Sequence, residues 1–73
     1  MWIKRQNILL NGNNIKAIVA DSEDYKIKAD TNDGKIIVLF KARSTESLME
    51  IYDMIIDQIS RGDTVIAFPL EDD

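Results

Sequence analysis

The chain has 73 residues, which is the size of one small domain. It contains no cysteine and no histidine, which excludes disulfide bonds, thiolate nucleophiles, histidine general bases and cysteine or histidine zinc sites. Hydrophobic residues make up 45% of the chain and charged residues 30%, as in ordinary soluble domains. A domain this small without covalent staples needs a well-packed core or self-association for its stability.

The formal net charge is −4, and the acidic excess lies in the second half of the chain. Residues 1–40 contain six basic and five acidic residues, whereas residues 41–73 contain three basic and eight acidic residues. This balance argues against general affinity for nucleic acid or anionic membranes, because both need a positive protein surface. No apolar run reaches the length of about 18 residues that spans a membrane, and no signal-peptide core follows Met1. We therefore expect a cytoplasmic protein without a membrane partner.

The first half of the chain is typical of short strands separated by turns. Apolar or alternating residues predict strands over residues 2–5, 15–20, 25–31 and 35–41, with a further apolar patch over residues 8–10. Asparagine and glycine predict a turn at residues 11–14, and Asn-Asp-Gly at residues 32–34 predicts a hairpin. The strand over residues 35–41 contains five successive apolar residues, so we expect it to be central in its sheet.

The second half contains the helical pattern of the chain. Apolar residues between Leu48 and Ile59 recur at spacings of three and four, Ser44 is suited to the N-cap, and Gly62 marks the helix end. Residues 64–68 predict a final strand that Pro69 closes. This order predicts a single α+β domain over residues 1–70, in which one helix packs on a curled antiparallel meander and a final strand follows. Residues 71–73 form an acidic tail.

Several of these features resemble a loose group of small uncharacterised proteins of Gram-positive bacteria and their phages and prophages. The resemblance lies in the opening Met1–Gln6, the Asn13–Ile15 entry into a strand, the single late helix and the closing Phe68-Pro69. The chain departs from that group at Asn7-Ile8, and in having Phe68 directly before Pro69. The resemblance implies a bacterial or phage accessory protein. It implies no functional residues, because the group has no established activity.

Four acidic residues form one stripe on the predicted helix, opposite its apolar face: Glu46, Glu50, Asp53 and Asp57. Like charges at these spacings cost on the order of a few tenths of a kcal/mol per pair, and Arg61 is the one nearby cation on the helix. One hypothesis is a surface that binds a basic protein partner and, in a phage, mimics the charge of nucleic acid. The alternative is a solvated face that keeps the protein soluble.

The strand over residues 35–41 is apolar on both faces, although a single helix covers only one face of a sheet. On the uncovered face we place Ile37 and Leu39, together with Ile18 of the preceding strands. With Trp2 as an anchor, these residues define a hypothetical homodimer surface. The alternative is a strongly curved sheet that folds residues 8–10 and Trp2 over this face and closes a single core.

Other motifs have simpler explanations. A second alternative function, weak nucleic-acid binding by Lys16, Lys26 and Lys28, is disfavoured by the net charge and the few aromatic residues. The acidic turn at residues 21–24 lacks the alternating ligands and the central glycine of a calcium loop, so we expect no bound metal. The Arg-Gly-Asp sequence at residues 61–63 is explained by the helix end and does not indicate cell adhesion.

Catalysis has little support in the sequence. Each of the three glycines falls at a predicted turn or helix end, so no phosphate-binding loop is indicated. The carboxylates of the helix are expected to be exposed, without the burial that separates acid from base roles. We therefore expect no enzymatic activity and no cofactor, and we favour a protein-interaction module that also self-associates.

Overall fold

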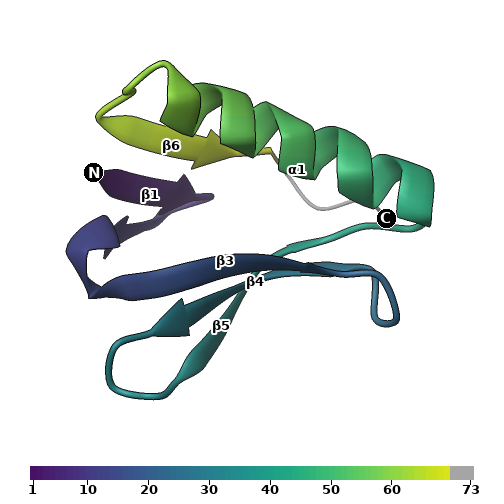
Figure 1. Cartoon of the computed structure of the whole chain (residues 1–73), viewed down its shortest axis with the longest axis horizontal. Coiled ribbons are helices and arrows are strands. Elements are labelled where there is room, and N and C mark those ends of the chain that lie inside the picture. Colours follow the sequence, from purple (N-terminus) through teal and green to yellow (C-terminus); the bar gives the residue numbers. More distant parts are fainter. Residues whose placement is uncertain (70–73) are drawn as a thin grey trace.

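The computed structural model describes residues 1–69 of the chain, so the predicted acidic tail at 71–73 lies outside the described residues. In chain order the elements are β1 (Trp2–Arg5), β2 (Ile8–Asn11), the 3₁₀ helix η1 (Gly12–Asn14), β3 (Ile15–Asp21), β4 (Lys26–Thr31), β5 (Ile36–Lys41), α1 (Thr45–Ser60) and β6 (Val65–Phe68) (Figure 1). The α+β prediction, with one helix packed on a sheet and a final strand after it, is confirmed.

Within residues 1–69 the strands form two three-stranded sheets rather than one continuous meander. The first sheet has the order β2-β1-β6, in which β1 is antiparallel to β2 and parallel to β6. The second sheet has the order β3-β4-β5 and is antiparallel throughout. The Trp2 amide also donates to the Thr64 carbonyl oxygen at 2.8 Å, so the start of the chain is tied to the last described strand.

The core lies between two layers. The second sheet forms one layer, and α1 lies beside β6 and β1 in the other (Figure 1). Apolar side chains from both sheets and from the helix meet there: Ile3, Ile27, Ala29, Leu39, Phe40, Leu48, Ile55, Ile66 and Phe68. Full burial of each large apolar side chain contributes about 1.5–3 kcal/mol, so this cluster is the main source of stability.

The alternation predicted for β4 is confirmed within the strand. Ile27, Ala29 and Thr31 are buried, and the charged residues between them are half-buried on the opposite face. Tyr25 does not continue this pattern, because it precedes the strand in a turn with a φ of 55° and is exposed. The pattern of residues 26–31 therefore indicates one buried and one open face of the second sheet.

The predictions for β5 were wrong in two respects. The strand lies at the edge of its sheet, because β4 pairs with β3 on one side and with β5 on the other. A β-bulge also leaves Leu39 without a partner in β4, because Ile27 pairs with Phe40 and Lys28 with Val38. The bulge turns both Leu39 and Phe40 toward the core, so Leu39 is fully buried and does not lie on an uncovered face.

Gly12 is required by close packing at the start of the chain. Its amide donates to the Met1 carbonyl oxygen at 2.9 Å, and a Cβ at this position would lie 2.6 Å from the same oxygen. Gly34, in contrast, has a φ of 84° and open space around it, so its requirement is conformational.

We expect Gly12→Ala to lower the free energy of unfolding by about 2 kcal/mol or more, because main-chain atoms must move to admit the methyl group. The matched variant Gly34→Ala should cost about 1 kcal/mol through its backbone conformation alone. Urea unfolding of both variants measures this difference. An equal or smaller loss for Gly12→Ala would contradict the close approach of Met1.

Candidate functional site

Helix α1 is held in a fixed orientation by its N-cap and its buried face. The Ser44 Oγ accepts a hydrogen bond from the Ser47 amide at 3.1 Å, which satisfies a first-turn donor. Leu48 and Ile55 are fully buried against the sheets. Because this face of the helix packs in the core, the opposite face points to solvent.

Gln58 ties the helix to the edge of β6. Its side-chain nitrogen donates to the Ala67 carbonyl oxygen at 3.1 Å, and its side-chain oxygen accepts from the Ala67 amide at 3.0 Å. The amide side chain thereby pairs with the edge of β6 as a neighbouring strand would. These two bonds fix the helix against β6.

The predicted acidic stripe lies on the exposed face of α1, where Glu46, Glu50, Asp53 and Asp57 are all solvent-exposed. Asp57 pairs with Arg61, which also contacts Asp63 at 3.0 Å. The hydrogen bond and the charge of Asp63, with a smaller effect from the charge of Asp57, raise the pKa of the Arg61 guanidinium.

The other three carboxylates of the stripe have no ion-pair partner among the residues that the structure describes. Exposed apolar residues flank them, with Met49 and Ile56 on one side of the stripe and Met54 on the other. The exposed face of α1 is therefore an acidic stripe within a partly apolar surface, and we call this set of residues the acidic helix face.

The residues predicted for self-association do not form one surface. Trp2 is 44% exposed on the outer face of β1, whereas Ile18 and Ile37 are half-buried and pack against the core. Leu39 is buried, so its assignment to a dimer surface was wrong. The bulge in β5 turns Leu39 toward the core. Ile18 and Ile37 face the same way, because both pair with the buried Ala29 of β4.

The outer face of the first sheet carries apolar residues that local sequence does not bring together. Val65 is opposite Trp2, and Leu9 is opposite Lys4, so these side chains share the face that points away from the core. Leu9 is 58% exposed and Val65 43%. The alternation of buried and exposed residues in β1 indicates this face, but the pairing of β1 with β6 was not predictable from local sequence.

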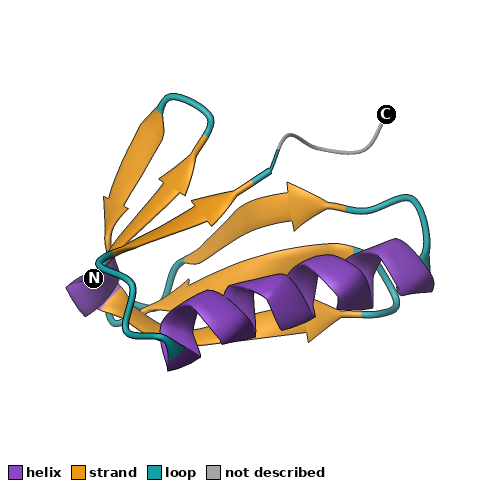
Figure 2. Cartoon of the chain, turned by 90° about the horizontal axis from the view of Figure 1, so that it is seen from above, coloured by secondary structure: helices purple, strands orange, loops and turns teal. Residues whose placement is uncertain are grey.

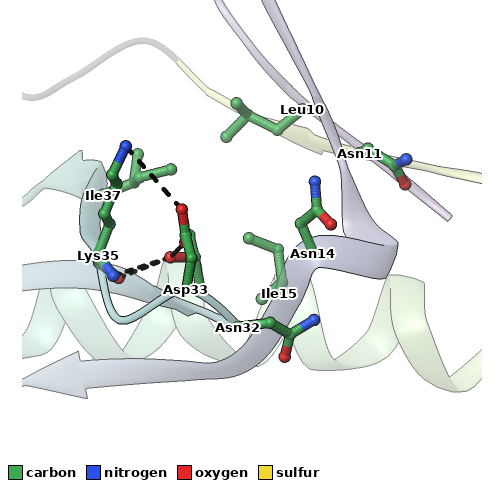
Figure 3. A pocket seen from close by; sticks show the side chains of 9 residues that line it. Leu10, Asn11, Asn14, Ile15, Asn32, Asp33, Lys35 and Ile37 are labelled. Carbon is green, nitrogen blue, oxygen red and sulfur yellow. Dashed lines mark hydrogen bonds and ion pairs between the residues drawn. The ribbon is translucent and has the colours of Figure 1, made fainter.

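A cleft of about 450 Å³ lies between β2 and the β4–β5 hairpin (Figure 3). Its apolar lining comes from Leu10, Ile15 and Ile37, and Figure 3 shows Leu10 and Ile37 on different sides of the cleft. Its polar lining consists of Asn11, Asn14, Thr31, Asn32, Asp33 and Lys35. Local sequence does not indicate this cleft, because its lining comes from two stretches, residues 10–15 and 31–37, that meet only in the folded chain.

Hydrogen bonds fix the polar side of the cleft. The Thr31 hydroxyl donates to the Asp33 carboxylate and accepts from the Lys35 amide, the latter at 2.9 Å. The main-chain N–H of Asn32 donates to the main-chain carbonyl oxygen of Asn14 at 2.9 Å, which joins the hairpin to η1. The Lys35 ammonium lies 3.9 Å from Asp33 and is itself well exposed. The cleft thus has a rigid hairpin as one wall.

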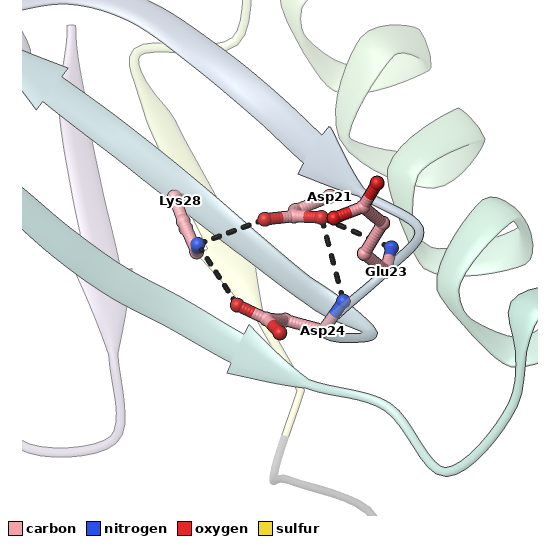
Figure 4. A network of polar contacts seen from close by, with 4 residues as sticks. All are labelled: Asp21, Glu23, Asp24 and Lys28. Carbon is pink, nitrogen blue, oxygen red and sulfur yellow. Dashed lines mark hydrogen bonds and ion pairs between the residues drawn. The ribbon is translucent and has the colours of Figure 1, made fainter.

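In the acidic turn after β3, the carboxylates of Asp21 and Asp24 pair with Lys28 (Figure 4). The Lys28 ammonium lies 2.9 Å from an Asp21 oxygen and 3.4 Å from an Asp24 oxygen. The hydrogen bond from Lys28, followed by that from the Glu23 amide, lowers the pKa of the Asp21 carboxyl below its ordinary value. Among residues 1–69, no three acidic side chains are grouped so that they could hold a metal ion.

The lowered pKa predicts an acid-dependent contribution of Asp21 to stability. The contribution is present above the ordinary pKa of 3.8 and is lost as the pH falls through the lowered value, because protonation removes the charge that Lys28 binds. Urea unfolding should therefore show that Asp21→Asn is less stable than the parent chain at about pH 6, and that the difference shrinks towards about pH 3. A difference that stays constant over this range would contradict the prediction.

No family model, curated protein or solved structure matches the chain. The helix of the described region is too short and too polar to cross a membrane.

Proposed function

We propose that this chain is a cytoplasmic protein-binding module that engages a basic protein through its acidic helix face. One observation carries the proposal: Glu46, Glu50 and Asp53 are exposed on a rigidly held helix without an ion-pair partner in the described part of the chain. Local helix energetics do not favour this arrangement, because like charges at these spacings repel each other. A basic partner surface would remove that repulsion.

The residues around the stripe support a protein partner. Met49, Met54 and Ile56 offer adaptable apolar contact area beside the charges. Charge complementarity steers the encounter and sets specificity, while desolvated apolar contacts contribute most of the affinity. Because the N-cap and Gln58 already hold the helix, binding requires little ordering of the main chain.

The proposal is tested with a helical peptide that carries leucine on one face and lysine on the other. We expect Glu50→Lys to weaken binding of this peptide about tenfold, since it replaces an attraction with a repulsion. The matched control Asp33→Lys makes the same change of charge at the exposed turn between β4 and β5, which lies far from α1 (Figure 1), and we expect it to change the affinity less than about twofold. Titration calorimetry at low and high salt measures both variants.

Equal weakening by the two variants would show that net charge alone governs binding, and would contradict the assignment to α1. Thermal unfolding of both variants verifies that each is folded. Binding that does not weaken with added salt would also contradict the proposal, because exposed ion pairs are screened.

A second candidate function is self-assembly through the outer face of the first sheet. The specific observation is that Trp2, Leu9 and Val65 share this face and are each more than 40% exposed. A small domain without staples gains stability from covering such a face.

For this second candidate, light scattering on a gel-filtration peak should give a dimer mass for the parent chain and a monomer mass for Trp2→Ser. We expect the exposed Leu9→Ser variant to shift the equilibrium in the same direction. A monomer mass for the parent chain at high concentration would remove self-assembly as a function.

A further inference from the structure

The outer edge of β5 is open in the described part of the chain. β5 is the last strand of the order β3-β4-β5, and among residues 1–69 no other strand pairs with it. An edge strand directs every second N–H and C=O group away from its partner. The bulge at Leu39 confines the regular part of this edge to residues 36–38, where Ile36 is 65% exposed.

The β1–β2 hairpin extends over the space beside this edge. Seen from above, the hairpin projects beyond the strands of the second sheet (Figure 2). Leu10 is opposite the buried Ile3 and Ile8 is opposite Arg5, so both side chains of β2 lie on the core-facing side of the hairpin. Leu10 packs against the core, but Ile8 is 45% exposed. An inward-facing apolar residue is thus left uncovered beyond the β5 edge.

The cleft lies between the β5 edge and the β1–β2 hairpin. Leu10 from β2 and Ile37 from β5 both line it, and its volume of about 450 Å³ is large enough for apolar side chains. The β5 edge supplies main-chain donors and acceptors, and the cleft lies on the inward side of the same strand. Main-chain pairing together with a side-chain pocket is the combination by which sheet edges recognise extended peptides.

The other sheet edges differ from β5. Gln58 closes the edge of β6 with its side-chain amide. The edge of β3 is interrupted by a register shift that leaves Lys16 without a partner, and charge and irregular register both oppose strand addition. β2 is short and ends in the polar Asn11. β5 is therefore the edge that combines an apolar run, residues 36–38, with an adjacent cleft.

We propose that the β5 edge and the cleft beneath the β1–β2 hairpin bind an extended segment of another protein as an added strand. The segment pairs with residues 36–38 of β5. It directs one apolar side chain into the cleft between Leu10 and Ile37 and places a second beneath Ile8. This site is separate from the acidic helix face and does not depend on the function proposed for that face.

Charge at the two ends of β5 favours an acidic segment. Lys35 precedes the strand and Lys41 ends it, and both side chains are exposed. Asp33, the partner of Lys35, is the one carboxylate that lines the cleft. Carboxylates at the ends of the bound segment would therefore meet lysine side chains.

A second copy of the chain fits the groove less well than a slender segment. Two β5 strands that pair about a twofold axis form one continuous sheet, which places both β1–β2 hairpins on the same side of it. In each copy the β1–β2 hairpin projects beyond the β3-β4-β5 sheet (Figure 2). The two hairpins would therefore compete for the space over the line where the two β5 strands pair. An extended peptide segment has no hairpin of its own, so it fits beside β5 without this competition.

The test uses a short blocked peptide in which valine alternates with threonine between terminal aspartates. Addition of this peptide to the isotopically labelled chain should shift the amide resonances of residues 35–39 and of Leu10, and leave those of α1 unchanged. A version of the peptide N-methylated at its central residues should not bind, because it lacks the donors for strand pairing.

Two comparably exposed apolar residues, Ile8 of β2 and Val19 of β3, provide a matched pair of variants. Ile8→Ser removes the apolar wall over the groove and should weaken binding by about fivefold or more, whereas Val19→Ser makes a similar change on the outer face of β3 and should change the affinity less than about twofold. Equal effects of the two variants would overturn the proposal. So would unchanged resonances of residues 35–39 at millimolar peptide.

Self-pairing is a separate outcome of the same experiment. Shifts of the residue 35–39 resonances on raising the protein concentration without peptide, together with a dimer mass, would assign the edge to a second copy and overturn the proposal. Failure of the peptide to bind leaves the acidic helix face untouched, because the lysine-leucine peptide tests that face independently.

Discussion

A single helix is too narrow to cover the inner face of a three-stranded sheet, and the rest of the structure depends on this constraint. α1 packs against β3 and β4, so the part of the second sheet nearest β5 must be covered by something else. The first sheet fills this role by placing Ile3 and Ile66 in the same core as Leu48 and Ile55. The parallel pairing of β1 with β6 makes this covering layer continuous with the helix.

The two proposed surfaces follow from how this second layer is built. The helix contributes its inner face to the core and presents its outer face, with the unpaired carboxylates, to solvent. The first sheet covers the core but projects past β5 and leaves Ile8 exposed. One surface is therefore the acidic outer face of a helix that Gln58 ties to β6, whereas the other is a groove with open main-chain groups. Their chemistries suit different partners, so they need not compete.

Local sequence predicts those parts of the fold that depend on local periodicity. The helix, its Ser44 cap and the inward residues of β4 are confirmed because each is determined by neighbours within a few positions. The face of β5 could not be predicted, because a single extra residue at Leu39 reverses the alternation. Exposure of the acidic stripe follows from helical spacing, but its function stays a prediction.

Long-range pairing accounts for the rest of what the sequence did not reveal. The pairing of Trp2 with Val65 joins opposite ends of the described chain, and no local pattern indicates it. The cleft likewise joins separate parts of the chain, because Leu10, which pairs with Ile3 of β1, and Ile37 of β5 both line it. The role of Gly12 is similar, since its requirement arises from contact with Met1 and not from the turn geometry that the sequence suggests.

Native-state amide hydrogen exchange tests most directly whether the second layer leaves the β5 edge uncovered. In the free protein, the amides of β4 should exchange slowly at every position, because both neighbours pair with this strand. Over residues 36–38 of β5, slow amides that donate to β4 should alternate with fast amides that point away from it. Uniform slow exchange along residues 36–38 would show that the edge is already covered, and would contradict this account of the fold.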